Sequence, residues 1–342
     1  MIYRKNVRAI LSAIIIVGMG LLIGCDERNE PELPAIVYTL KKNIVTPGVA
    51  LSVDAEENLL AVAASSAGTF VYDITNVSVP VEMFHYEPPG RLFSSEVEVD
   101  AINGLVVTSS GPLSEAGDKY PVHVIETGQR IGGLAFTSPE EMELRSFEGI
   151  LNVWRTDNSD GLAFDSYCYN ADSARWRPDY CTDFYVGIPN ASYRLRGFGI
   201  RDTLVAVAQA NFEIRLHNIS SGLINTRFST TGDPQDVAWY GDFLLVADNV
   251  HFTVVNVANL DSPSVVKTLT IPGADRLQRV VTEGNYAILL DDADGLYVVD
   301  VSTPTDPKHV QTISLPEVSS VTAANGRVIA SDEQLGVLIY ER

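Results

Sequence analysis

The sequence predicts an all-β fold for residues 34–342, a seven-bladed β-propeller built from four-stranded antiparallel blades. A pair of apolar, β-branched strands around a short polar turn, which is a hairpin pattern, recurs seven times along the chain. Further strands precede and follow the hairpins, so that each repeat spans roughly 40–50 residues. No segment carries a sustained helical period. These observations together are typical of a propeller.

The hairpins set the order of the seven units. Strands such as EVEVD and QRVVT stand ahead of hairpins, and strands such as PVEMFHY and PSVVKTLTI follow them. Each complete unit therefore supplies the four strands of one blade. The hairpins begin at Asn58, Gly104, Gly149, Asp202, Gly241, Gly284 and Gly326.

The two ends of the chain predict how the ring closes. The last unit stops after its third strand, at Tyr340, and the missing strand has a counterpart at the other end. Residues 34–43, PAIVYTLKKN, match PKHVQTISLP of unit 6. We expect residues 34–43 to pair with the C-terminal hairpin, which removes two exposed sheet edges.

Units 5 and 6 contain VADNVHFTVVNVANLDSPSVVKTL and LLDDADGLYVVDVSTPTDPKHVQTI. These segments resemble the LVIVD repeat, which belongs to a bacterial family of extracytoplasmic propellers. The similarity is close in units 5 and 6, partial in units 1, 4 and 7, and poor in units 2 and 3. The resemblance covers most of residues 34–342 and implies a seven-bladed propeller, often on a secreted or lipid-anchored protein. It implies no defined activity.

Residues 1–24 are predicted to be a lipoprotein signal peptide. A basic start precedes a short apolar run, too short to span a bilayer comfortably, that ends at LIGC. This tetrapeptide resembles the lipobox of bacterial lipoproteins, which implies cleavage before Cys25 and lipidation of its thiol. The alternative is an uncleaved N-terminal anchor. Residues 25–33 would then be the lipidated cysteine and a flexible tether.

A lipidated Cys25 predicts a protein of the cell envelope outside the cytoplasm, on the periplasmic or the cell-surface side. Asp26 and the acidic residues after it resemble both inner-membrane retention and surface-export signals, so the membrane stays open. Removal of the signal takes away three basic residues and no acidic one, which changes the net charge from −20 to −23. This charge disfavours nucleic acid and anionic lipid as partners. The expected membrane contact is therefore the lipid anchor only.

Cys168 and Cys181 are the other two cysteines, in an exported and oxidising setting. We expect a disulfide between them, which the loop-entropy relation values at about 3 kcal/mol. A metal or redox pair is disfavoured, because a CxxC spacing and nearby histidines are missing.

The stretch LLDDADG in unit 6 raises the question of a metal site. Asp291, Asp292 and Asp294 precede Gly295 in a predicted hairpin turn. A calcium loop needs six or more oxygen ligands, and its usual spacing would require an aspartate where Leu290 stands. Other units carry polar turns in the same slot. We interpret the stretch as a structural turn, with a weak calcium site as the alternative, and expect no other cofactor.

No catalytic constellation emerges from the sequence, so we nominate no catalytic residue. The histidines fall in five different units, and neither a metalloprotease motif nor a nucleophile elbow is present. His123 and His217 fall on third strands, where a structural role is favoured. The five histidines are His85, His123, His217, His251 and His309.

Departures from the repeat mark the candidate contact surface. Unit 2 carries residues 109–121 at its hairpin turn, and unit 3 carries residues 169–180 inside the predicted disulfide loop. The latter include residue types that dominate binding interfaces, and a disulfide would preorganise them. The alternative is that the tryptophan packs on its own blade while the arginines pair with local carboxylates. The candidate residues are Arg175, Trp176, Arg177 and Tyr180.

These observations predict a binding or scaffolding module whose partner is a protein, with a glycan as the second option. The alternative is a hydrolase or lyase with its site at the mouth of the central channel, by analogy with other propellers. A cluster of His, Asp and Arg on the innermost strands would favour the enzyme. A purely structural role in an envelope assembly is a third interpretation.

Overall fold

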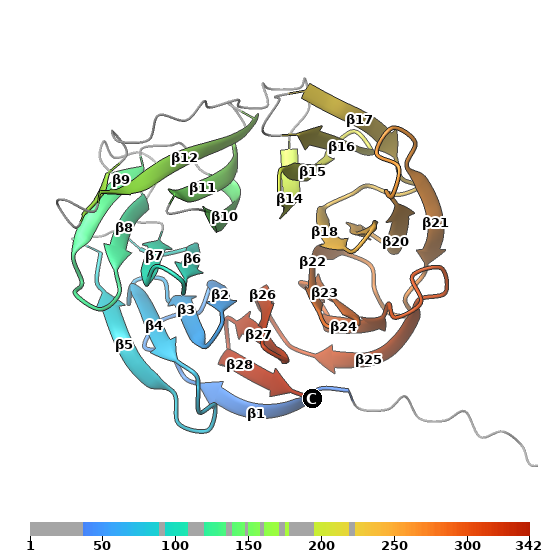
Figure 1. Cartoon of the computed structure of the whole chain (residues 1–342). Helices are drawn as coiled ribbons and strands as arrows, with labels where there is room; N and C mark the ends of the chain where they lie inside the picture. The colour runs from blue at the N-terminus through green and yellow to red at the C-terminus, as the bar shows by residue number, and fades with distance from the viewer. Residues whose placement is uncertain are drawn as a thin grey trace, which may run out of the picture. The chain divides into compact units, whose positions relative to one another are not determined.

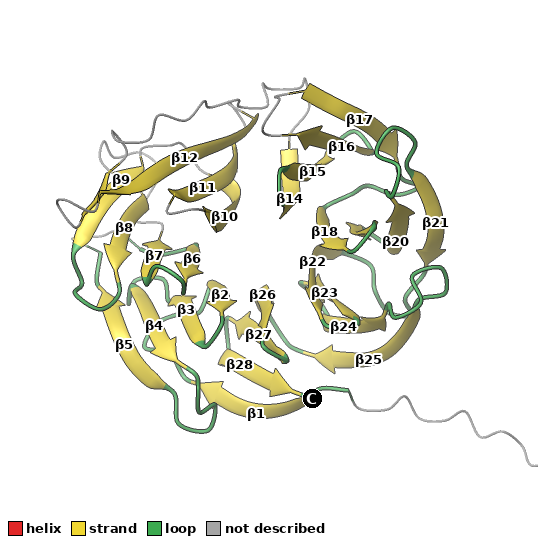
Figure 2. Ribbon diagram, viewed as in Figure 1, coloured by secondary structure: helices red, strands yellow, loops and turns green. Residues whose placement is uncertain are grey.

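Twenty-eight strands form seven four-stranded antiparallel sheets in the computed structural model (Figures 1 and 2). The structure describes residues 37–88, 93–108, 120–134, 139–147, 150–157, 161–170, 175–177, 195–218 and 223–342. All of them lie in one unit, Ala35–Arg342. Within the described ranges no helix is present that could cross a membrane.

Each sheet is one blade, and its strands follow one another from the centre of the ring outward. Blades 1 to 3 consist of β2 (Ser52–Glu56), β3 (Leu59–Ala63), β4 (Thr69–Asp73) and β5 (Val81–Tyr86); β6 (Val97–Asp100), β7 (Leu105–Thr108), β8 (Tyr120–Val124) and β9 (Arg130–Leu134); and β10 (Pro139–Phe147), β11 (Ile150–Asp157), β12 (Gly161–Asn170) and β13 (Arg175–Arg177).

Blades 4 to 7 complete the ring. They consist of β14 (Leu195–Arg201), β15 (Leu204–Gln209), β16 (Glu213–Asn218) and β17 (Leu223–Ser229); β18 (Asp236–Tyr240), β19 (Phe243–Asp248), β20 (His251–Asn256) and β21 (Ser264–Leu269); β22 (Leu277–Glu283), β23 (Tyr286–Asp291), β24 (Gly295–Asp300) and β25 (Lys308–Ser314); and β26 (Val318–Ala324), β27 (Arg327–Asp332), β28 (Gly336–Glu341) and β1 (Thr39–Ile44).

The innermost strands β2, β6, β10, β14, β18, β22 and β26 contact one another in sequence, and β26 contacts β2. The middle strands of the blades are almost entirely buried, because both of their faces pack against neighbouring blades. The outer strands are mostly exposed, as in β1 and β5. This contrast follows from radial packing of the sheets, in which the middle strands are covered on both faces and the outer strands form an edge that meets solvent.

The predicted ring closure is confirmed. β1 pairs antiparallel with β28, with Leu40 opposite Tyr340, and becomes the outer strand of blade 7 (Figure 1). The paired strand runs from Thr39 to Ile44, one residue beyond the predicted end. The first and last parts of the chain therefore share one sheet.

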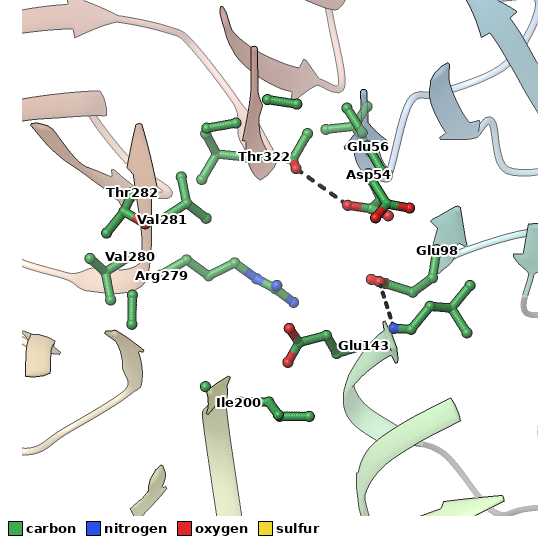
Figure 3. A pocket seen from close by; sticks show the side chains of 18 of the residues that line it. Asp54, Glu56, Glu98, Glu143, Ile200, Arg279, Val280, Val281, Thr282 and Thr322 are labelled. Carbon is green, nitrogen blue, oxygen red and sulfur yellow. Dashed lines mark hydrogen bonds between the residues drawn. The ribbon is translucent and has the colours of Figure 1, made fainter. Parts of the chain in front are cut away.

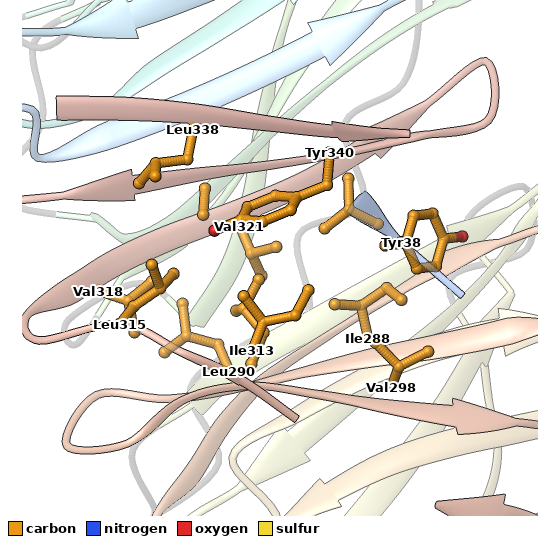
Figure 4. Packing of buried hydrophobic residues seen from close by; sticks show 13 residues of the cluster. Tyr38, Ile288, Leu290, Val298, Ile313, Leu315, Val318, Val321, Leu338 and Tyr340 are labelled. Carbon is orange, nitrogen blue, oxygen red and sulfur yellow. The ribbon is translucent and has the colours of Figure 1, made fainter. Parts of the chain in front are cut away.

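Residues just ahead of β1 fasten this closure to blade 6. The Gln311 side chain on β25 accepts hydrogen bonds from the backbone N–H groups of Val37 and Tyr38, at 2.9 and 2.8 Å, and donates one to the Tyr38 carbonyl at 2.8 Å. The Tyr38 ring is 1 % exposed and packs in the hydrophobic cluster between blades 6 and 7, near Ile288 and Tyr340 (Figure 4). Burial raises the pKa of the Tyr38 hydroxyl to about 12.

The ring has two faces, which we name by the chain segments at each. The hairpin face carries the turns between the second and third strands of each blade and the loops that lead from one blade to the next. The entry face carries the other turns, and there the chain enters β1 at Thr39, opposite Glu341. Backbone hydrogen bonds such as Ser94 N–H to Ser65 O, 3.0 Å, join interblade loops to hairpin turns on the hairpin face.

Candidate functional site

A cavity of about 450 Å³ lies in the channel at the centre of the ring, lined by the innermost strands of all seven blades. Carboxylates occupy the wall formed by blades 1 to 3, with Asp54 on β2, Glu98 on β6 and Glu143 on β10. Arg279 of β22 extends its guanidinium into the cavity from the opposite wall (Figure 3). The cavity reaches Glu57, in a turn on the entry face.

The carboxylates affect one another because they share this enclosed space. Burial raises the pKa of Glu98 well above its ordinary value, and the nearby carboxylates of Asp54 and Glu143 raise it further. Burial also raises the pKa of Asp236 on β18. The Arg279 guanidinium and two backbone N–H groups lower this pKa and so offset part of the effect. The channel therefore carries strongly perturbed acidic groups, which is a common property of functional sites.

Several carboxylates on the innermost strands also join successive blades. Each accepts a hydrogen bond from a backbone N–H on, or just after, the innermost strand of the following blade. These N–H groups lie on the inner edge of a sheet, where no further strand can pair with them. The bonds are Val99 N to Asp54 Oδ2, 2.9 Å; Ala101 N to Glu56 Oε2, 2.7 Å; Leu144 N to Glu98 Oε2, 3.3 Å; Val280 N to Asp236 Oδ2, 2.9 Å; and Gly326 N to Glu283 Oε1, 2.9 Å.

The channel is thus acidic, and several of its carboxylates also hold neighbouring blades together. Arg279 is the basic residue among the described lining, and all five histidines lie on third or outer strands rather than on innermost ones. His123 and His217 are buried, as expected for structural residues. The cluster of His, Asp and Arg that would favour an enzyme is not formed among the described residues of the channel.

The channel residues were not predicted as a group from the sequence. Their signal was present in segments such as EVEVD, where charged residues alternate with buried ones and so face one side of an innermost strand. What the strand pattern could not tell is that this side faces a channel shared by all blades. Asp54, Glu98 and Arg279 are far apart in sequence and meet only through closure of the ring.

The aspartates of LLDDADG are placed in the hairpin turn of blade 6, as predicted. Asp291 is fully buried, and its two carboxylate oxygens accept N–H groups from Asp275, Arg276 and Ala293 at 3.0, 2.9 and 3.1 Å. Asp292 pairs with the Arg276 guanidinium at 2.5 Å. Ligand atoms of Asp275, Asp291 and Asp294 lie within 4.8 Å of one another. Three carboxylates are fewer ligands than calcium requires. Asp291 also already accepts hydrogen bonds from backbone N–H groups.

An aspartate at the same position also accepts hydrogen bonds from backbone or hydroxyl groups in blades 5 and 7; we call it the aspartate anchor. Asp332 of β27 accepts N–H groups from Glu317 in the preceding interblade loop, at 3.0 Å, and from Gln334 and Leu335 in its own hairpin, at 2.9 and 2.8 Å. Asp248 of β19 accepts the Gly232 N–H at 3.1 Å and two threonine hydroxyls. Burial raises the pKa of Asp248. An aspartate at this slot therefore holds an interblade loop against a hairpin turn.

The turn after the third strand is held by Asx side chains in several blades. The side chains of Asp73, Asn256 and Asp300 each accept the backbone N–H two residues further on, at 2.7, 2.9 and 2.8 Å. Recurrence of Asx residues there is architectural.

The prediction of a loop in unit 3 is wrong in part. Residues 175–177 form β13, the outer strand of blade 3, in which Trp176 lies opposite Tyr169 and Arg177 opposite Cys168. An outer strand is bonded on one side only and faces solvent, so its residue pattern does not distinguish it from a loop. In unit 2, Tyr120 already belongs to β8, so the enlarged turn is shorter than residues 109–121.

The remaining predicted site residues lie outside the described ranges. They are Cys25, Tyr180 and Cys181. The disulfide between Cys168 and Cys181, the lipidation of Cys25 and the contact role of Arg175, Trp176 and Arg177 therefore stay predictions.

Comparisons with known proteins support the fold. Over 89 % of its length the chain superposes on 94 % of a chain in a structure titled "Crystal Structure of Mitotic Checkpoint Complex", with a TM-score of 0.65 and 10 % sequence identity. This likeness concerns the fold alone. Among curated proteins, no sequence matches the chain.

The LVIVD repeat matches three segments, residues 47–87, 231–270 and 276–313. They correspond to blades 1, 5 and 6, so the resemblance expected in units 4 and 7 is not among these matches. The aspartate anchors of blades 5 and 6 lie inside the matched segments. In three of its seven blades, then, the chain is similar to the LVIVD repeat family, and as a whole it is a seven-bladed β-propeller.

Proposed function

We propose that this propeller is a binding module outside the cytoplasm, held at a membrane by lipid on Cys25, and that its partner is a protein. The path of the chain into the ring carries the proposal. Val37 and Tyr38 lead into β1 from the entry face, and β1 runs toward the hairpin face. A tether joined to Val37 would meet the ring at the entry-face end of β1, so it would leave the turns of the hairpin face uncovered for partners.

The distribution of exposed apolar side chains supports the hairpin face as the binding surface. Large apolar residues in turns and loops gather there, whereas the described turns of the entry face contribute Val79 and Ile102. Three of them, Val45, Val49 and Leu335, border one concave surface, and clustered exposed apolar side chains mark interaction sites. The residues on the hairpin face are Val45, Val49, Phe93, Phe212, Val250 and Leu335.

The channel gives less support to a hydrolase or lyase. Asp54 and Glu98 accept backbone N–H groups of the next blade, so a part of their hydrogen-bonding capacity serves the ring. General acid–base catalysis needs groups that can reach a bound substrate, and a nucleophile with its base is not apparent among the described lining residues.

An affinity pull-down in mild detergent from native membranes tests the binding proposal. Wild type is compared with a Trp176→Ala, Arg177→Ala variant of β13. Arg227→Ala is the matched control, since it is exposed on β17, the outer strand of the next blade. We expect a protein that is retained by wild type and by the control and is lost from the double variant. Absence of any partner in all three would contradict the proposal.

The anchor is tested separately. Cys25→Ser should abolish metabolic labelling with palmitate. A Cys25→Ser protein that still incorporates palmitate, or a wild type that incorporates none, would show that lipid on this residue is not the anchor.

A further inference from the structure

We propose that a groove at the ring closure, on the hairpin face, docks a segment of a partner protein that carries an apolar side chain beside lysine or arginine. This inference rests on the proposed binding function and adds the site and the chemistry of the partner. The groove has a volume of about 270 Å³. One wall is the loop after β1, residues 45–49, and the other is the β27–β28 turn, residues 333–336.

Apolar side chains stand exposed on both walls. Val45 is 82 % exposed, Val49 41 % and Leu335 40 %. Three large apolar residues that border one concave surface favour a docked side chain, because covering them removes apolar area from water.

Both walls are held in place before any partner binds. Asp332 accepts the N–H groups of Gln334 and Leu335, which fixes the turn that carries Leu335. Thr46 donates its hydroxyl to the Gly48 carbonyl at 2.5 Å within the other wall. Gly336 has a φ of +90°, and a Cβ there would meet the Ile44 carbonyl at 2.5 Å, so the two walls approach closely. A preformed groove reduces the entropic cost of binding.

The negative charge of the residues around the groove favours a partner segment that carries basic residues. Glu333 lines it, and the carboxylate of Glu317 accepts a hydrogen bond from the Gln334 side chain at 3.0 Å. The loops of this part of the hairpin face, residues 45–51, 64–68, 315–317 and 333–335, contain no lysine or arginine. Cationic residues on the docked segment would therefore complement the surface and speed association.

A protein segment fits this surface better than a membrane or a second copy. The groove opens on the face opposite to the end of β1 at which the tether enters, and the anionic lipid of a membrane surface would be repelled by Glu317 and Glu333. Two copies joined through the same face would set Glu317 and Glu333 of one against those of the other, which like charges oppose.

Site-specific photo-crosslinking in the full-length chain, in native membranes, tests the proposal. A benzophenone amino acid replaces Leu335 in one variant and Ile102, 74 % exposed on the entry face, in the control. We expect a protein adduct at position 335 and none at 102. Mass spectrometry of the adduct should locate the link in a segment with an apolar residue next to lysine or arginine.

A second pair of variants tests the charge. Glu317→Lys with Glu333→Lys should lower the yield of the adduct at position 335 about ten-fold, while the melting temperature stays unchanged because both glutamates are exposed. Glu126→Lys, in the exposed turn after β8 on the entry face, is the matched control and should leave the yield as it is.

The outcomes separate the inference from the function on which it rests. A protein adduct at position 102 alone would overturn the groove and leave the binding function standing. An adduct with a second copy of this chain, with lipid, or with a segment that lacks basic residues would overturn the proposed partner. No adduct at either position, together with no partner in the pull-down, would count against both proposals.

Discussion

Blades 5 and 6 and blades 2 and 3 are built on the same four-stranded plan, but the first two match the LVIVD repeat and the other two do not. In blades 5, 6 and 7 a buried aspartate, Asp248, Asp291 or Asp332, bonds the preceding loop to the hairpin turn. Blades 2 and 3 show no LVIVD match and carry most of the predicted contact residues. The difference teaches that the recurring aspartates are architectural, and that binding residues are to be sought in the side chains around them, as at the groove beside the Asp332 turn, and in the blades that depart from the repeat.

Removal of the closing strand should have the largest effect. Deletion of residues 34–43 takes away β1 and the buried Tyr38 ring, whose loss alone is expected to cost about 3–5 kcal/mol. Because a domain of this kind has a total stability of about 5–15 kcal/mol, cooperative folding should be largely lost. Circular dichroism melting measures this, with deletion of residues 26–33 as the control. An unchanged melting temperature for the first deletion would contradict the closure.

Loss of one aspartate anchor should be the next largest effect. Asp332→Ala leaves the N–H groups of Glu317, Gln334 and Leu335 without their acceptor, at an expected cost of about 2–4 kcal/mol. Asp294→Ala, an exposed aspartate of the blade 6 turn, should stay within about 0.5 kcal/mol of wild type. Urea unfolding compares the two. Equal effects would mean that the buried slot has no special role.

Buried histidines should make the ring sensitive to acid. Burial lowers the pKa of His123 and His217 to about 4, whereas both titrate near 6.5 when unfolded. The unfolded chain therefore binds more protons between these values, and the free energy of unfolding should fall as the pH drops from 6.5 toward 4. Above pH 6.5 the contribution is constant.

The variant His217→Val isolates one of these groups. Valines occupy the same bulge position in blades 5 and 6, at Val255 and Val299. The variant should show a shallower loss of stability between pH 6.5 and 4 in denaturant titrations. A pH profile identical to that of wild type would rule out His217 as a contributor.

Glu98→Gln should act in the opposite direction. The raised pKa of Glu98 means that its ionisation at neutral pH destabilises the folded ring, with a penalty that grows as the pH rises above the unfolded value near 4.5. Glutamine keeps an acceptor for the Leu144 N–H and carries no charge. The variant should melt higher than wild type at pH 7.5 and lose this advantage toward pH 4.5. A lower melting temperature at pH 7.5 would count against the acidic crowding of the channel.

Calcium should have the smallest effect. Because Asp291 is engaged with backbone N–H groups, low millimolar calcium is expected to leave the melting temperature of wild type unchanged. Magnesium at the same concentration controls for ionic strength. A calcium-specific rise of several degrees would establish a metal site at Asp275, Asp291 and Asp294.

Most of the fold could be predicted from the sequence, because hairpin turns and buried strands have strong local patterns. Gly295, for example, ends a polar turn where φ is +114° and where a Cβ would meet the Ile313 carbonyl at 2.2 Å. Such a position is nearly restricted to glycine, and the sequence reveals it. Closure by residues 34–43 was predictable because the last unit was one strand short.

The channel and the groove could not be predicted in the same way. Asp54, Glu98 and Arg279 come from three blades, and Val45 and Leu335 come from opposite ends of the chain. No local pattern records such neighbours, since they depend on the ring as a whole. β13 was missed for another reason: a strand of three residues is too short to show an alternating pattern.

The position of β1 also determines how the ring would bear mechanical load. Any pull on the N-terminal segment reaches the folded unit first at Val37 and Tyr38, where Gln311 and the core between blades 6 and 7 hold the chain. Beyond them the force would run along β1 and act in shear on its bonds to β28, so that several would have to break together. The strand that completes the ring would thus also transmit to the whole propeller any force applied to the N-terminal segment.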